Sequence, residues 1–238
     1  LVDTALSAGF PKPTHDKTFS LAGTYHTRLS ATPSAHQLAI CDFECADLSD
    51  LQLTGAGSSL TQEHFATGTQ SLLMKECKEN NKPWMPLVSI PVLVEQQGAP
   101  IGYQISFDAM LDEDRPGIFS LSVRGTKSNA GITSNAGITN LATIEVAQDG
   151  IRINTSLIAP TEPGTWTHFD LQFDLSQTSD RMIRILITTE HGDMWQRNVP
   201  AEDYLFDRAT NIQIISLGDP NTKVYIDNVL VTSNIGTD

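Results

Sequence analysis

The chain has 238 residues, with 28 Asp and Glu against 15 Lys and Arg, and its formal net charge is -13. Because such an acidic surface repels phosphate groups, the composition argues against nucleic acid as a partner. No apolar run approaches the roughly 18–20 residues of a membrane span, so no span is expected, and the length suits one large all-β domain.

Residues 1–37 are rich in Thr, Ser, Ala, Pro and His and have no sustained apolar period, so we interpret them as an N-terminal leader or linker. From residue 38 the sequence changes to short alternating runs separated by Gly, Pro, Asn and Asp, which is typical of a sandwich or barrel. We therefore predict one β-sandwich domain over residues 38–238. Its strands are expected at 38–45, 70–75, 87–94, 101–110, 117–124, 141–147, 150–154, 166–175, 181–189, 211–218 and 223–232.

Alternation of apolar and polar residues is clearest in three of these segments. In 101–110, Tyr103 and Phe107 share one face and alternate with polar residues on the other. Residues 119–124 and 166–175 follow the same pattern. Each strand therefore has a core face and a wet face, and ligand-binding residues are expected on the wet faces or in loops.

The wet faces of three predicted strands carry Gln104, Arg124 and His168. An amide, a guanidinium and an imidazole can match the donors and acceptors of sugar hydroxyls, and Arg124 can pair with a uronate or sulfate group. Together with Ser122 they are expected to form a shallow groove if their strands are neighbours. A polysaccharide lyase needs similar groups, with a His as base and an Arg or Gln to neutralise the uronate carboxylate.

Two tryptophans, Trp84 and Trp195, occur in polar, turn-rich segments and are therefore expected in loops. An exposed indole is a common platform for the apolar face of a sugar ring, so both are candidate ligand-binding residues. Trp166 stands at the start of a predicted strand, where we expect it to be buried.

Four short motifs follow one another along the chain in the order x-F-E … G-x-x-S-L … W-x-x-F-D-L-x-F-D-L … Y-I-D-N-V. This order resembles that of the carbohydrate-binding β-sandwich modules over roughly residues 38–232. The resemblance implies an antiparallel jelly-roll β-sandwich of the concanavalin-A type, the lectin and glucanase scaffold. In such a fold the first and last strands lie side by side.

The resemblance also implies a structural calcium ion. In those modules the Glu of the "F-E" strand and the Asp of the "Y-I-D" strand converge on Ca²⁺, and backbone carbonyls complete the shell. The matching residues are Glu44 and Asp227, with the carbonyls of 68–71. Calcium takes several oxygen ligands at about 2.3–2.6 Å, so such a site would stabilise the sandwich and have no catalytic role. The alternative is two acids that are hydrogen-bonded to a loop.

A retaining glucanase of the laminarinase type would carry an E-x-D-x-x-E or E-x-D-x-E run on one strand, and the chain has none. The resemblance favours a non-catalytic module that binds a polysaccharide or oligosaccharide. Its expected place is a secreted, periplasmic or cell-surface protein, and other domains of a longer polypeptide are a second class of partner. A polysaccharide lyase on the same jelly roll is the alternative, and a structural surface-assembly domain is the third reading, because a fold does not fix a function.

Overall fold

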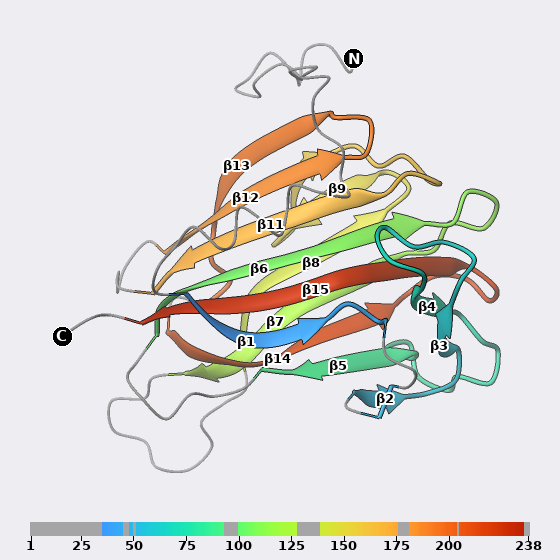
Figure 1. The fold of residues 1–238 in the computed structure, drawn as a ribbon, viewed down its shortest axis with the longest axis horizontal. Coiled ribbons are helices and arrows are strands. Elements are labelled where there is room, and N and C mark those ends of the chain that lie inside the picture. The colour runs from blue at the N-terminus through green and yellow to red at the C-terminus, as the bar shows by residue number, and fades with distance from the viewer. Residues whose placement is uncertain are drawn as a thin grey trace.

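The computed structural model describes residues 35–44, 48–49, 51–92, 100–127, 139–175, 181–203 and 205–235. These residues form the strands β1 to β15 and no helix, so the described part of the chain has no helix that could cross a membrane. The strands make two antiparallel sheets that lie one behind the other (Figure 1). The predicted all-β antiparallel sandwich is confirmed.

The larger sheet has eight strands, and the first and last strands of the chain are neighbours in it. Its first strand, β1, pairs antiparallel with its last strand, β15, as the resemblance implies. On the same edge of β15, but nearer its start, lies β4. The order is β13 (Met194–Pro200), β12 (Met182–Thr189), β11 (Thr167–Asp174), β6 (Pro100–Leu111), β15 (Lys223–Ile235), β4 (Ser71–Lys75) and β3 (Ser58–Thr61), with β1 (Ala35–Cys41) beside β15.

The smaller sheet has seven strands and covers the inner face of the larger one. Its centre is the pair β7 and β14, which are antiparallel and joined over most of their length. The order is β10 (Ser156–Ala159), β9 (Gly150–Ile153), β8 (Thr139–Ala147), β7 (Phe119–Lys127), β14 (Phe206–Ser216), β5 (Leu87–Pro91) and β2 (Gln52–Thr54).

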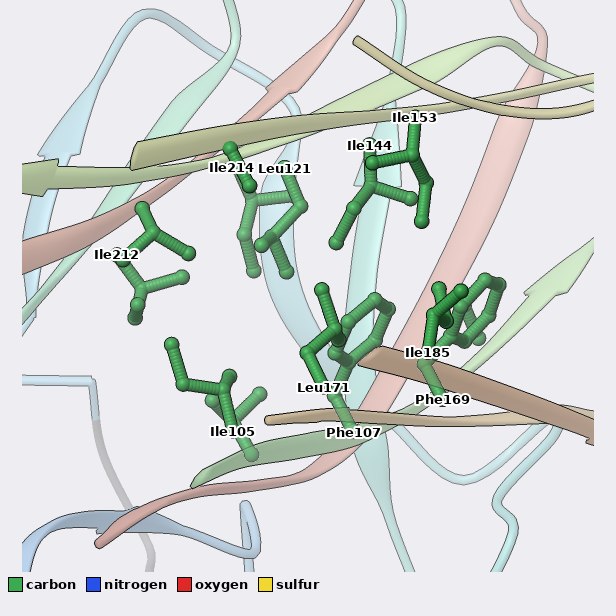
Figure 2. Close-up of a cluster of buried hydrophobic side chains, with 14 of the residues drawn as sticks. Ile105, Phe107, Leu121, Ile144, Ile153, Phe169, Leu171, Ile185, Ile212 and Ile214 are labelled. Carbon is green, nitrogen blue, oxygen red and sulfur yellow. The ribbon is translucent and has the colours of Figure 1, made fainter. Parts of the chain in front are cut away.

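The hydrophobic core lies between the two sheets and is built by the apolar face of each strand. Figure 2 shows Ile105 and Leu171 of the eight-stranded sheet pointing toward Leu121 and Ile214 of the seven-stranded sheet. Phe107 and its neighbour across the strands, Phe169, are stacked with ring centroids 4.5 Å apart. Fully buried side chains of this kind drive the two sheets together, because each removes its apolar surface from water.

Each of the eleven predicted strands overlaps an observed strand. The four observed strands that the sequence did not predict are β2, β3, β10 and β13, which stand at the two ends of each sheet; β1, which also has one partner strand, was predicted. An edge strand has one partner and buries less of its surface, so its apolar alternation is weak. The expected domain boundary at residue 38 falls inside β1, and the leader proposed for 1–37 lies, up to residue 34, outside the described residues.

Candidate functional site

The expected groove of four polar side chains is not formed, and this prediction was wrong. Gln104 on β6 and His168 on β11 belong to neighbouring strands of the eight-stranded sheet. Ser122 and Arg124 lie on β7, in the seven-stranded sheet. The polar faces of the two sheets point in opposite directions, away from the core. The alternation of residues predicts the face of a strand and does not predict the sheet to which the strand belongs.

His168 is part of a buried chain of hydrogen bonds on the outer side of the eight-stranded sheet. Its Nδ1 lies 2.7 Å from Oδ1 of Asp108, and both side chains are buried. The Nδ2 group of Asn228 donates to the other oxygen of Asp108 at 2.7 Å. The hydroxyl of Thr67 then donates to Oδ1 of Asn228 at 2.9 Å. His168 is therefore held in a network that connects β11 to the β3–β4 loop.

Gln104 lies two rows further along the same face, in a band of polar side chains that crosses the eight-stranded sheet. Its Nε2 donates to both carboxylate oxygens of Asp170 at 3.2 Å. The strand register places six polar residues in this row: Asn198, Arg184, Gln172, Gln104, Thr232 and Gln37. Most of them are exposed, so the band is a second polar surface that the sequence indicated only through Gln104.

Arg124 belongs to a compact polar surface on the outer side of the seven-stranded sheet, which we call the β7–β14 face. It consists of Ser89, Ser122, Arg124, Thr143, Asn211 and Gln213, on four neighbouring strands. Nη1 of Arg124 donates to Oε1 of Gln213 at 2.6 Å. Nδ2 of Asn211 donates to the hydroxyl of Ser89 at 2.8 Å. The hydroxyls of Ser122 and Thr143 lie 3.4 Å apart.

Sequence reasoning found Arg124 and missed its partners on β14. The signal was present, because Asn211 and Gln213 alternate with Ile212 and Ile214, which are buried in the core. The Nε atom of Arg124 is buried and has no hydrogen-bond partner among the described residues. The β7–β14 face therefore holds a guanidinium group whose hydrogen-bonding capacity is only partly used.

The three tryptophans have different environments. Trp195 lies in β13, not in a loop, and only 7% of it is exposed, so its predicted place on an open surface was wrong. It alternates with Met194 and Gln196, which puts its indole on the core side of the strand. Trp166 is buried, as expected, against Met110. Trp84 is 41% exposed in the connection between β4 and β5, which agrees with the loop position expected for it.

Glu44, the first of the two expected calcium ligands, is exposed and binds the β3–β4 loop through hydrogen bonds. Its Oε1 accepts from the backbone N–H of Thr69 at 2.9 Å and of Gln70 at 3.1 Å, and its Oε2 accepts from the Thr69 hydroxyl at 2.7 Å. The bonds from Thr69 lower the pKa of Glu44. Gly68 beside it has a φ of +74°, a backbone conformation that other residues rarely adopt, so glycine is favoured at this position.

Asp227, the second expected ligand, is fully buried and binds the other end of the same loop. Its Oδ2 accepts from the N–H groups of Ala66 at 2.9 Å and Thr67 at 3.2 Å, and its Oδ1 accepts from the N–H of Asn228 at 2.8 Å. Burial raises the pKa of Asp227 to about 7, against the opposite effect of these backbone bonds.

The two carboxylates thus bind one segment, residues 66–70, at its two ends. Their contacts are N–H and O–H donors, whereas a calcium shell is made of oxygen acceptors that face the ion. No cluster of three or more His, Cys, Asp and Glu side chains suited to a metal occurs in the part of the chain that the structure describes. These contacts fit a hydrogen-bonded loop anchor better than a calcium shell, and the calcium ion stays a prediction.

No protein-family model matches the sequence, and the comparison with curated proteins finds no match either. Solved structures do match. An endo-β-1,4-glucuronan lyase from the fungus Trichoderma reesei superposes with a TM-score of 0.53 at 14% identity, over 82% of this chain and 95% of that one. Peanut lectin gives a TM-score of 0.52 at 12% identity, over 86% and 99% of the two chains.

An alginate lyase from Aplysia kurodai has a TM-score of 0.52 at 9% identity, with 94% of this chain and 97% of that chain covered. The matches therefore extend over nearly the whole of each neighbour. Identities of 9–14% show a shared fold and nothing finer. By that fold, the chain is a concanavalin-A-like jelly-roll β-sandwich.

Proposed function

We propose that this protein binds a polysaccharide without cleaving it, and that the β7–β14 face is the binding surface. The observation that carries the proposal is the cluster around Arg124, in which hydroxyl, amide and guanidinium groups from four adjacent strands lie side by side. These groups supply both the donors and the acceptors that sugar hydroxyls require.

The side chains of this face are fixed before any ligand arrives. Arg124 is held by Gln213, and Asn211 is held by Ser89. Ordering a long side chain on binding costs about 0.5–1.5 kcal/mol, and a side chain that is already ordered avoids part of this cost. The rigid strands below add to the preorganisation, because they keep the spacing of the polar groups constant.

The charge of Arg124 favours an acidic sugar at this face. The chain as a whole is strongly acidic, so a negatively charged polysaccharide needs a local cation to offset the repulsion. A guanidinium can bind a carboxylate or a sulfate through two parallel hydrogen bonds. A uronate-containing or sulfated polysaccharide is therefore the expected ligand class. Such a ligand also implies a secreted, periplasmic or cell-surface location.

The arrangement of the polar residues supports binding over cleavage. A lyase built from Gln104, Arg124 and His168 would need all three side chains at one sugar unit. Arg124 lies on one sheet, and the other two lie on the outer side of the opposite sheet. The whole thickness of the core therefore separates the imidazole from the guanidinium.

The test is a polysaccharide binding assay with wild-type protein, Arg124→Gln and the control Arg184→Gln. Arg184 is exposed on the outer side of the eight-stranded sheet, so its replacement makes the same change in charge at another surface. We expect Arg124→Gln to weaken binding at least about tenfold, since a hydrogen bond to a charged group contributes roughly 1.5–3 kcal/mol. Arg184→Gln should bind like the wild type.

The same samples are assayed for unsaturated uronate products. Turnover by the wild type would assign the protein to the lyases and overturn the proposal. Absence of binding to every acidic and neutral polysaccharide in the panel would favour a structural surface-assembly domain instead. Equal weakening by both substitutions would show that the β7–β14 face has no special part in binding.

A further inference from the structure

A pocket opens at one end of the sandwich, where the β4–β5 connection meets the β14–β15 connection. Its volume is about 490 Å³, which lies within the range of roughly 300–1,000 Å³ that is typical of small-molecule sites. The lining residues that matter for its chemistry are Glu76, Lys78, Asn81, Lys82, Met85 and Leu217. No residue of the β7–β14 face contributes to it.

Backbone hydrogen bonds hold the walls of this pocket in place. Glu76 and the β14–β15 connection are joined twice, through Glu76 N–H to the Thr222 carbonyl at 3.0 Å and Asn221 N–H to the Glu76 carbonyl at 2.9 Å. The side chain of Asn80 bonds the backbone of Ala56 in both directions, at 2.9 and 3.1 Å. These bonds keep the two connections that form the pocket at a fixed spacing.

The charges that line the pocket favour an anion. Lys78 and Lys82 are both exposed, and neither forms an ion pair with a described residue. The lining acid is Glu76, which is buried, and burial raises its pKa. Two ammonium groups at one pocket make it a local exception to the acidic average of a chain with 28 acids and 15 bases.

The remaining walls suit the body of a sugar ring. Met85 and Leu217 line the pocket with apolar surface. Trp84 is 41% exposed and stands in the chain between Pro83 and Met85, which both line the pocket. The amide of Asn81 can donate to and accept from ring hydroxyls. A ligand that matches these walls has an apolar ring face, several hydroxyls and one negative charge.

We propose that this pocket binds one hexuronate unit, with its carboxylate at Lys78 and Lys82 and its ring against the apolar wall. The pocket is a second binding site, made by loops, and it does not depend on the β7–β14 face. Because an ammonium group is a point charge with rotating donors, the lysines select for charge, while the apolar wall and Asn81 select for a sugar over a simple anion.

The experiment is a titration of the whole protein with D-glucuronate, D-glucose or sodium sulfate at constant ionic strength. Binding is followed by calorimetry and by tryptophan fluorescence, in which exposed Trp84 is the residue that can respond, since Trp166 and Trp195 are buried. We expect saturable binding of glucuronate, and binding of glucose and sulfate at least about tenfold weaker.

The variants are the double substitution Lys78→Gln with Lys82→Gln and the control Lys75→Gln. Lys75 lies on β4 and does not line the pocket, so it tests for a general effect of charge. The double variant should lose affinity for glucuronate by about tenfold, since two contacts to a charged group are removed, whereas Lys75→Gln should be unchanged. An equal loss in the control, equally tight binding of sulfate, or no saturation with glucuronate would each overturn the proposal.

The same variants separate this proposal from the proposed function. Arg124→Gln should weaken polysaccharide binding, and the loss of glucuronate affinity caused by the Lys78 and Lys82 substitutions should be the same size in the Arg124→Gln background. If glucuronate binds as expected but no polysaccharide does, the pocket inference stands and the β7–β14 proposal fails. If a polysaccharide binds through Arg124 but glucuronate never saturates, the reverse holds.

Discussion

Removal of the Asp227 carboxylate should destabilise the fold by releasing the β3–β4 loop. In Asp227→Ala, three backbone N–H groups lose their acceptor, those of Ala66, Thr67 and Asn228. A buried donor without a partner costs about 1–3 kcal/mol, and because these three residues are only half-buried we take the lower figure for each. The expected loss in the free energy of unfolding is therefore about 3 kcal/mol.

Urea denaturation in excess chelator measures this loss without any contribution from a bound cation. The midpoint should fall while the slope m stays constant, since the surface exposed on unfolding is unchanged. In a thermal scan, a loss of that size lowers the Tm of a domain of this length by roughly 6–12 °C. Asp227→Asn keeps one acceptor oxygen and should lie between the alanine variant and the wild type.

Asp114→Ala is the matched control, because Asp114 is exposed in the β6–β7 connection. It should stay within about 0.5 kcal/mol of the wild type. If Asp227→Ala were equally harmless in chelator, the reasoning that this carboxylate holds the loop through hydrogen bonds would be refuted.

Three further predictions concern the metal, the tryptophans and the pH dependence of stability. If calcium binds as the resemblance implies, a chelator should lower the Tm of the wild type and have no effect on the Tm of Asp227→Ala. An unchanged wild-type melting curve would contradict the calcium prediction. Trp195→Ala should lose about 3–5 kcal/mol of stability by opening a cavity in the core, whereas Trp84→Ala should lose less than about 1 kcal/mol. Similar losses of the two variants in urea denaturation would contradict the assignment of Trp195 to the core and of Trp84 to the surface. Burial raises the pKa of Glu76 above its usual 4.5, so the folded protein holds this proton more tightly and stability should fall as the pH rises through and above 4.5. Denaturation from pH 4 to 8 should show that Glu76→Gln reduces this fall and that Glu79→Gln, at an exposed position, does not.

The core strands could be predicted from the sequence because their alternation is complete. Phe107 and Phe169, each between polar neighbours, show at once that β6 and β11 have one apolar side. The edge strands lack this pattern. β2 has only the three residues Gln52–Thr54, and two of them are exposed. Trp195 was misplaced for the same reason, since β13 is an edge strand in which the two buried residues, Trp195 and Val199, do not form a continuous alternation.

The site was harder to predict because it depends on which strands become neighbours. The wet faces of β6 and β7 were identified correctly, but Gln104 and Arg124 belong to different sheets. The sequence distance between two strands does not determine whether they pair or cross to the opposite layer. For Glu44 and Asp227 the sequence left two alternatives open, a calcium site and hydrogen bonds to a loop. It identified the two acids but not the N–H and O–H groups that donate to them.

The position of β15 has a consequence for how the protein folds. This strand, residues 223–235, stands between β6 on one side and both β1 and β4 on the other. During synthesis the N-terminal strands β1 and β4 leave the ribosome long before their partner exists, and they must wait with unpaired backbone groups. Folding that depends on such distant pairings is slow, since a long loop has to close before any contact forms. A chain cut before residue 223 would lose the strand that joins β6 to β1 and β4 in the eight-stranded sheet. A chaperone that shields β1 and β4 until β15 has been synthesised is expected to raise the yield of folded protein.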